Sequence, residues 1–365
     1  MDKLKQLTVP DQARMIVISD IHGELELFKR LLEKVNYNSQ DDYLIINGDM
    51  CEKGSNSIGV VSYIKSLSKT NPKVHVTEGN CEALVEELLN ENPKLINYLV
   101  ARKHSIMNEW LTQLDYPVDE NSNIQEVKEV LTKHYSEDID WLMRLPTAIE
   151  TEDYIFVHAG LDDKENWKET DRDMAITIPA FLTKSHRSKK YVIVGHWPVV
   201  NYSSHLPLNN PIIDHEKRII AMDGGNVVKR SGQLNALIIR PSYEEQFSYT
   251  YVDHFENFTV KEDFQADPKM VGSIKYPMYK INPIKEKDHF TLCEKIGSEE
   301  QIYVKNEYIQ KDENGEITVT DDLSCAQISV KKGEMVSLIN GDCTAYALIK
   351  KDGAEGWVKK EAIGL

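Results

Sequence analysis

Six side chains that can bind metal ions follow short apolar segments of the chain. They are carboxylates, imidazoles and one amide, namely Asp20, His22, Asp49, Asn80, His158 and His196. One histidine or aspartate at such a place is most often a structural hydrogen-bonding residue or a turn former. Six donors at five successive positions indicate a shared site instead. Oxygen and nitrogen donors suit manganese, iron or zinc, and a shared carboxylate such as Asp49 can hold two ions about 3.5–4 Å apart, an arrangement that hydrolyses phosphate esters.

The elements that position these donors are predicted from the apolar segments themselves. Segments 14–20, 42–49 and 73–80 each end in a polar or glycine turn and are followed by a helical pattern. This alternation favours an α/β fold with ligands at the carboxyl ends of its strands. Further strands are expected at 153–160, 191–198, 217–225, 234–240 and 246–255.

The remaining segments divide the chain into parts. We expect one domain over residues 1–260, with amphipathic helices forming a cap at about 83–145. Prolines punctuate a polar stretch at 261–285, which predicts a linker. Residues 286–365 alternate short strands with glycine turns and no helix, which predicts a small all-β barrel.

Composition narrows the class of protein. The 365 residues are 41% hydrophobic and 28% charged, which is typical of a folded globular chain. A formal net charge of −16 opposes general binding to nucleic acid or to an anionic membrane. No signal peptide or membrane span is readable, and the five scattered cysteines include no CxxC pair. We therefore expect a cytoplasmic protein with reduced thiols.

Five sequence blocks carry a resemblance to a known family. "SDIHG", "GDMCEKG", "GNCE", "VHAG" and "VGHWP" occur in that order between about residues 14 and 240. They resemble the signature blocks of the calcineurin-like metallophosphoesterases, specifically the phosphoprotein phosphatase family. As a set the blocks are a strong signal, although each alone is weak. The resemblance implies a four-layer α/β/β/α sandwich with a helical cap and a two-metal site.

The resemblance also assigns roles to the six donors. Asp20 and His22 would hold the first metal ion, Asp49 would bridge, and the second ion would take Asn80, His158 and His196. Two divalent ions are thus expected, with manganese preferred and iron, zinc and nickel as alternatives. The implied reaction is in-line attack on phosphorus by a metal-bridging hydroxide, without a covalent phosphoenzyme.

Three residues depart from the family pattern. Cys81 stands where the family has the histidine that protonates or stabilises the leaving oxygen, Glu52 replaces the aspartate that supports it, and Lys53 replaces the phosphate-clamping arginine. A neutral thiol is a poor proton donor, and general acid catalysis is typically worth about 10²–10⁴ in rate. Lys53 keeps a positive charge without the two-pronged grip. Glu52 could pair with Lys53 or reach the leaving group. A substrate with a good leaving group, or a slow enzyme, is expected.

Cys81 has other interpretations as well. As a small buried residue at the start of a helix it could simply pack, the lost acid being tolerated. A redox-sensitive site is a third interpretation, since a helix N-terminus can lower the pKa of a thiol.

Other residues are candidates for substrate contact. Beside Lys53 and Asn80, Arg102 in the cap could meet a phosphate, although such a residue is more often on a solvated helix face. Asp223 is expected to be a turn or supporting residue.

The C-terminal stretch ending "GWVKKEAIGL" resembles bacterial Src-homology-3-type barrels over residues 286–365. Its functional candidates are recognition of a peptide or cell-wall fragment, with Trp357 and Tyr346 as an aromatic face, and support of the catalytic domain.

Two classes of function remain open at the level of sequence. The preferred one is a metal-dependent phosphatase acting on phosphoproteins or phosphorylated small molecules, with dinucleoside tetraphosphate hydrolysis as the main alternative. The other is a metal-bearing binding protein with reduced catalysis.

Overall fold

The structure is a computed structural model that describes residues 1, 3–243, 246–298 and 300–365. The chain forms two compact units. The first contains Met1–Pro198, Pro211–Val228 and Gln233–Asp253, and the second contains Val199–Asn210, Lys229–Gly232 and His254–Leu365.

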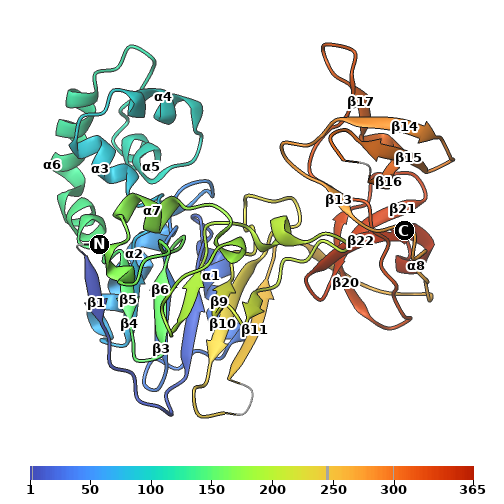
Figure 1. The fold of residues 1–365 in the computed structure, drawn as a ribbon. Coiled ribbons are helices and arrows are strands. Elements are labelled where there is room, and N and C mark those ends of the chain that lie inside the picture. The colour runs from blue at the N-terminus through green and yellow to red at the C-terminus, as the bar shows by residue number, and fades with distance from the viewer. Residues whose placement is uncertain (2, 244–245, 299) are drawn as a thin grey trace. The chain divides into compact units, whose positions relative to one another are not determined.

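Two sheets form the centre of the first unit (Figure 1). The five-stranded sheet has the order β11-β10-β2-β3-β4, with strands β2 (Met15–Ile18), β3 (Tyr43–Asn47), β4 (Val74–Thr77), β10 (Leu234–Ile239) and β11 (Phe247–Val252). The six-stranded sheet has the order β1-β5-β6-β7-β9-β8, with strands β1 (Leu4–Gln6), β5 (Ala148–Glu150), β6 (Tyr154–Val157), β7 (Tyr191–Val194), β8 (Ile212–Asp214) and β9 (Ile219–Ala221). β2, β3 and β4 are parallel, as are β6, β7 and β9.

Alternating side chains bury both faces of the five-stranded sheet. Met15 and Val17 of β2 join Phe156 and Ile193 of the other sheet in one apolar cluster, so the two sheets pack face to face. Ile16 and its alternate neighbours face the opposite way, toward helices α1 (Leu25–Lys34) and α2 (Ser57–Thr70). Burial on both faces explains why these strands are continuous apolar runs in the sequence.

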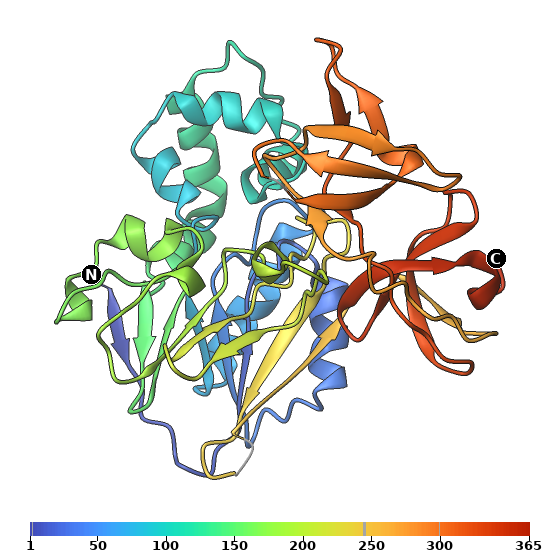
Figure 2. The ribbon, with the colours of Figure 1, turned by 45° about the vertical axis from the view of Figure 1, so that its right-hand side comes forward.

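Helices complete the layers of the first unit. Between β6 and β7 of the six-stranded sheet, the chain forms η1 (Trp167–Glu169), α7 (Arg172–Thr177) and η2 (Phe181–Thr183), where η marks a 3-10 helix. The 3-10 helix η3 (Val199–Tyr202) follows β7 and belongs to the second unit. The cap contains α3 (Leu84–Leu89), α4 (Lys94–Ala101), α5 (Ile106–Gln113) and α6 (Ile124–Met143). Figures 1 and 2 show the cap at one end of the sheets. The expected metallophosphoesterase-type α/β fold with its helical cap is confirmed.

The second unit is built almost entirely of antiparallel strands. One sheet has the order β12-β20-β21-β22 and another the order β14-β15-β16, and two pairs are β13 with β19 and β17 with β18. The strands are β12 (Glu256–Thr259), β13 (Ser273–Ile274), β14 (Ile281–Lys285), β15 (Phe290–Lys295), β16 (Gln301–Lys305), β17 (Ile309–Lys311), β18 (Ile317–Val319), β19 (Leu323–Ser324), β20 (Met335–Asn340), β21 (Tyr346–Lys351) and β22 (Ala354–Lys359). Its helical elements among the described residues are η3, η4 (Asn306–Tyr308) and α8 (Lys360–Ile363). The expected all-β character is confirmed, whereas the Src-homology-3 resemblance stays a prediction.

The second unit differs from the sequence expectation in two places. The stretch 261–285, expected as a linker, contains β13 and β14 and belongs to this unit, because its apolar residues Met270, Ile274 and Ile281 are buried in the unit's core. Four residues near the C-terminus form α8, where no helix was expected.

Two further expectations concern cysteines and membranes. Each of the five cysteines is buried and free, as expected for reduced thiols. None of the helices in the described ranges combines the length and apolar character that a membrane crossing requires.

Candidate metal centre

The six expected metal donors follow the carboxyl ends of five strands. Asp20 and His22 come after β2, Asp49 after β3, Asn80 after β4, His158 after β6 and His196 after β7. The strands that precede them are parallel within each sheet, so their ends lie at the same edge. The packing of the two sheets then brings both sets of loops to one place.

Left-handed backbone conformations aim several of these side chains. Asp20, His22, Asp49 and His196 have φ between 50° and 64°. Such conformations cost a non-glycine residue about 1–3 kcal/mol each and persist only where the surrounding structure holds them. Four such residues lie in the loops that carry the donors, so the backbone of these loops is held in an unfavourable conformation that directs the donor side chains.

Asp49 lies at the middle of the donor cluster. Its Oδ1 is 3.3 Å from Nε2 of His158, and its Oδ2 is 3.8 Å from Nε2 of His22. Nε2 of His22 is also 3.9 Å from Oδ1 of Asp20. The amide oxygen of Asn80 is 3.2 Å from Nε2 of His158. These separations place a shared carboxylate between two sets of nitrogen and oxygen donors.

The hydrogen bonds of His158 indicate that a cation fits here. Its Nδ1 lies 3.0 Å from the carbonyl oxygen of Asn47, which can only accept, so Nδ1 carries the hydrogen and donates. In the neutral ring Nε2 then presents a lone pair toward the oxygens of Asp49 and Asn80, which also have lone pairs. Three electron-pair donors that converge in a buried place suit a divalent metal ion.

The other two histidines are also held by backbone carbonyls. Nδ1 of His22 lies 3.3 Å from the carbonyl oxygen of Cys51, and Nε2 faces the carboxylates. Nε2 of His196 lies 3.1 Å from the carbonyl oxygen of Thr177. The backbone N–H of His196 donates to Asp20, and its ring centre is 5.2 Å from that of His158. The structure thus brings the six expected residues to one place, although Nε2 of His196 is turned to Thr177 and His196 is in neither metal-capable cluster of the described residues.

Burial and mutual repulsion shape the charges of the cluster. Burial and the nearby Asp49 raise the pKa of Asp20, although the hydrogen bond from Ser19 and the charge of Lys53 act against them. Burial would also raise the pKa of Asp49, but His158, His22 and Lys53 together hold it below its usual range. Burial and Lys53 lower the pKa of His22 to about 3, and burial with His158 lowers that of His196 to about 4. Buried carboxylates beside neutral imidazoles form a site that a cation would stabilise.

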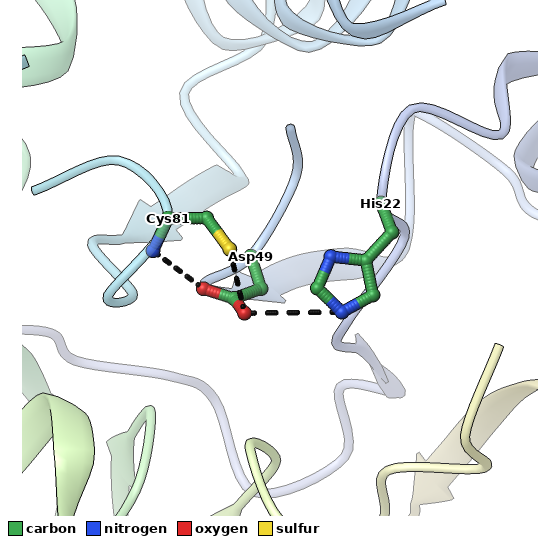
Figure 3. Close-up of side chains that lie close together, drawn as sticks. All are labelled: His22, Asp49 and Cys81. Carbon is green, nitrogen blue, oxygen red and sulfur yellow. Dashed lines mark hydrogen bonds and ion pairs between the residues drawn. The ribbon is translucent and has the colours of Figure 1, made fainter. Parts of the chain in front are cut away.

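Cys81 lies against the central carboxylate (Figure 3). Its thiol donates to Oδ2 of Asp49 at 3.0 Å, and its backbone N–H donates to Oδ1 at 3.0 Å. Burial and the Asp49 charge raise the pKa of this thiol well above its ordinary value. The redox interpretation of Cys81 was based on a lowered thiol pKa, and the raised pKa of this buried thiol does not support it. The turn at Cys81 precedes α3, which begins at Leu84.

The side chain of Glu52 makes its hydrogen bonds with the cap and not with the six metal donors. Its carboxylate accepts from the hydroxyl of Tyr98 at 2.6 Å and from the backbone N–H of Ile106 at 3.0 Å. Burial raises the pKa of Glu52 to about 7. The hypothesis that Glu52 pairs with Lys53 or reaches a leaving group is therefore wrong for this structure, because both carboxylate oxygens are engaged by α4 and α5. Glu52 attaches the cap to the loop that carries Asp49.

Lys53 reaches the donor cluster. Its ammonium nitrogen lies 3.1 Å from Nε2 of His22. Burial would lower the pKa of Lys53, but Cys81, Asp49 and Asp20 raise it overall. The backbone N–H of Lys53 donates to the carbonyl of His104 in the cap. Lys53 thus supplies a positive charge beside the predicted metal ligands.

Two other expected residues have their printed hydrogen-bond or ring contacts outside the donor cluster, although Asp223 is close enough to Asp20 for that charge to raise its pKa. Arg102 is exposed at the end of α4, with its guanidinium carbon 5.5 Å from the centre of the Tyr98 ring. Asp223 accepts from the N–H of Gly225 at 2.7 Å, as a turn residue does. In the part of the chain that the structure describes, the guanidinium of Arg102 contacts Tyr98 of the cap and not a metal donor.

Glu82 supports the site, although sequence reasoning assigned it no role. One carboxylate oxygen accepts from the N–H groups of Asp49 and Gly79 at 2.8 Å, and the other from those of Met50 and Cys51 at 2.8 and 3.3 Å. This single buried side chain holds the two loops that carry Asp49 and Asn80. Its signal was present as the last residue of "GNCE".

Asn47 and Ser19 are further supporting residues. The side-chain amide of Asn47 donates to the carbonyls of Val157 and Ile193 at 3.0 and 3.1 Å, which joins the two sheets beside the site. The hydroxyl of Ser19 donates to Asp20 at 2.5 Å. The available signal was a polar residue at the end of an apolar segment, Asn47 being the last residue of β3 and Ser19 the first residue after β2.

Comparison with known proteins adds a family match. The family model for calcineurin-like phosphoesterases matches residues 13–217, more than half of the chain. A symmetrical bis(5'-nucleosyl)-tetraphosphatase of Buchnera aphidicola is 46% identical over 63 residues, which are 17% of this chain and 22% of that protein. The protein of the same name from Vibrio parahaemolyticus is 24% identical over 195 residues, 52% of this chain and 58% of that protein. The chain therefore spans less than two thirds of each of these relatives.

Solved structures resemble the chain in fold. A protein serine/threonine phosphatase from Saccharomyces cerevisiae is 12% identical with a TM-score of 0.46, over 70% of this chain and 84% of that one. A cold-active protein-tyrosine phosphatase from Shewanella is 17% identical with a TM-score of 0.41, over 69% and 83%.

Proposed function

This chain belongs to the calcineurin-like phosphoesterase family, and from this premise we propose that it is a metal-dependent phosphohydrolase for substrates with good leaving groups. The observation that carries the proposal is the convergence of lone-pair donors on Asp49, with His158 held in the tautomer that a metal ligand needs. Enzymes of this class need such a set because phosphoryl oxygens and attacking water both carry negative charge in the reaction.

The predicted metal ligands are the six donors around Asp49. Asp20 and His22 would hold one ion, Asn80, His158 and His196 the other, with Asp49 shared between them. When bound, the ions supply Lewis-acid stabilisation of phosphoryl oxygens and lower the pKa of bound water. Manganese, iron, zinc and nickel all remain candidates under this proposal.

The chain's own residues then determine which substrates suit the site. Lys53 offers an ammonium group for a phosphoryl oxygen, although it lacks the paired donors of a guanidinium. In the metal-free chain the thiol of Cys81 donates to Asp49, and a thiol is a weaker acid than the imidazolium it replaces, so Cys81 gives a departing alkoxide little help. Glu52 is engaged by the cap and does not compensate.

A phosphoanhydride is the substrate class that fits these residues best. Its leaving group is a stable phosphate anion that needs no proton as the bond breaks, unlike the alkoxide of phosphoserine. The curated relatives named symmetrical bis(5'-nucleosyl)-tetraphosphatase support the same class, with a dinucleoside tetraphosphate as the example. Phosphoproteins, expected from the sequence, stay a prediction, as does peptide or cell-wall recognition by the second unit.

The test compares substrates that differ in their need for an acid. The full chain would be assayed with manganese, iron, zinc or nickel on diadenosine tetraphosphate, p-nitrophenyl phosphate and a phosphoserine peptide, beside Asp49→Asn. We expect the first two to be hydrolysed and the peptide to be slower by about 10²-fold or more. Equal turnover of the peptide would overturn the substrate class. No turnover above the mutant for any substrate would favour a metal-bearing binding protein.

A further inference from the structure

We propose that Cys81 is itself a metal ligand, so that the ion held by His22 and Asp49 is bound through sulfur as well as nitrogen and oxygen. The proposal rests on the metal-dependent function above and concerns the identity of one ligand. It assigns Cys81 a role different from the proton donor, packing residue and redox group considered from the sequence.

The geometry brings three ligand atoms of different kinds together. The sulfur of Cys81, one oxygen of Asp49 and one ring nitrogen of His22 all lie within 4.8 Å of one another. Figure 3 shows the three side chains converging from separate loops. The sulfur is 3.0 Å from Oδ2 of Asp49, and that oxygen is 3.8 Å from Nε2 of His22. Each of the three side chains is buried.

These separations match what a tetrahedral ion requires. Zinc binds sulfur at about 2.3 Å and nitrogen or oxygen at about 2.0–2.2 Å, so two ligand atoms of one ion lie roughly 3.3–3.8 Å apart. The observed 3.0 and 3.8 Å bracket that range. The third separation, from the sulfur to a ring nitrogen of His22, is less than 4.8 Å.

Cys81 is held in this direction by its own backbone. The N–H of Cys81 donates to the same carboxylate as its thiol does, so the turn and the side chain are aligned on Asp49. Glu82, the next residue, anchors the turn through Gly79 and the Asp49 loop. The sulfur is thus presented to Asp49 by a rigid segment.

Lys53 is the charged group that opposes this ion. Its ammonium lies 3.1 Å from Nε2 of His22 and would have to leave that nitrogen when a cation binds there. A lysine has a flexible four-carbon stem, so such a move needs no change of the backbone.

Binding of the ion replaces the proton of the Cys81 thiol. The S–H bond of Cys81 breaks, its proton is released to solvent, and its electron pair stays on sulfur, from which one lone pair is donated to the ion. No oxidant or reductant is required. Metal ions deprotonate coordinating thiols outright, so the hydrogen bond from sulfur to Asp49 is replaced by a shared ion.

A sulfur ligand changes the expected metal. Thiolate selects zinc and other soft ions, whereas carboxylate and water suit manganese. The His-to-Cys difference from the family pattern would then shift this centre away from manganese, which the sequence alone favoured. The residue at this position would then bind the metal ion instead of donating a proton to the leaving group.

Cys51 provides a matched control within the same loops. It is also buried, but its thiol lies 3.3 Å from Oε1 of Glu82, a carboxylate already occupied by backbone N–H groups. No ring nitrogen joins that pair in the metal-capable clusters of the described residues. A serine at either position keeps the size and the hydrogen bond of the thiol.

The experiment is cobalt(II) titration of the full-length metal-free protein, followed by absorption. We expect a near-ultraviolet sulfur-to-cobalt charge-transfer band, lost in Cys81→Ser and retained in Cys51→Ser. Zinc affinity should fall in Cys81→Ser by roughly 10–100-fold or more, since loss of even an outer partner of a ligand costs that much. Zinc-edge X-ray absorption of the unmutated protein should show a sulfur neighbour at about 2.3 Å, which needs no variant to fold.

The outcomes separate this proposal from the proposed function. Cobalt that binds with visible ligand-field bands but without a sulfur band would overturn the Cys81 ligand and leave the metal-dependent function standing. A sulfur band that survives in Cys81→Ser would do the same. Absence of any bound cobalt or zinc would overturn both.

Discussion

The donors at the strand ends and the residues that replace the family's acid group differ in how they are held. Asp20, Asp49 and His158 converge and are fixed by backbone carbonyls, N–H groups and neighbouring side chains. Glu52, in contrast, turns from the donors to Tyr98 and Ile106 of the cap. Position within a motif therefore places the backbone, but the available partners decide where the side chain goes.

The largest effect should come from the shared donor. Asp49→Asn removes the charge that both metal-donor sets face, so the ions should bind weakly and hydrolysis should fall by roughly 10³-fold or more. Turnover of p-nitrophenyl phosphate and metal content after dialysis measure this. Asp173→Asn is the comparison, because that carboxylate lies exposed in the first turn of α7 with Arg172 as its ion-pair partner. If Asp49→Asn kept both its metal ions and its turnover, the donors at the strand ends would not be the metal ligands.

Glu82 should show the next largest effect, on folding. Glu82→Gln puts an amide N–H₂ against two backbone N–H groups, so two buried donors lose their acceptor at about 1–3 kcal/mol each. The unfolding free energy of the first unit, followed by calorimetry, should drop by at least about 2 kcal/mol. Glu87→Gln on the partly exposed side of α3 should change it by less than about 0.5 kcal/mol. Equal effects would show that the four N–H bonds to Glu82 are not what holds the loops.

The sequence contained most of this arrangement. Strand ends are readable because β2, β3 and β4 are buried on both faces and appear as apolar runs. The six donors follow directly, since their positions depend only on where strands stop. Glu82 was readable in principle, as the charged residue that follows a turn at the same edge.

The partner of Glu52 was not readable in this way. Its contacts Tyr98 and Ile106 are 46 and 54 residues away along the chain, and their position depends on how the cap helices pack. Similarly, Met270 and Ile281 of the presumed linker are spaced too irregularly to show a period, yet they are buried in the core of the second unit. Local pattern gives elements, whereas side-chain partners across distant elements require the packing itself.

A moderate, pH-dependent effect is expected at Glu52. The pKa of this carboxyl is about 7 in the folded chain, above its ordinary 4.5, because of burial. The folded state therefore binds the proton more tightly, and stability falls as pH rises between these values, by about 1.4 kcal/mol per unit at most. Glu52→Gln can still pair with Tyr98 and Ile106 but has no charge. Its stability relative to the wild type should rise by about 1–3 kcal/mol from about pH 5 to about pH 8.

Urea unfolding at the two pH values measures this change. Glu126→Gln, at an exposed position in the first turn of α6, should give the same difference from the wild type at both pH values. A flat difference for Glu52→Gln would mean that Glu52 is ionised throughout and that its two hydrogen bonds outweigh burial.

The smallest effect should come from Arg102. Its guanidinium lies over the ring of Tyr98 on the exposed surface of the cap, a contact worth about 0.5–1 kcal/mol at such sites. Arg102→Ala should therefore change kcat and KM by less than about twofold, as should Lys103→Ala beside it. Steady-state kinetics with the best substrate measures both. A tenfold rise in KM for Arg102→Ala alone would show that Arg102 contacts the substrate. Loss of a side chain that only stacks on Tyr98 would not weaken substrate binding selectively.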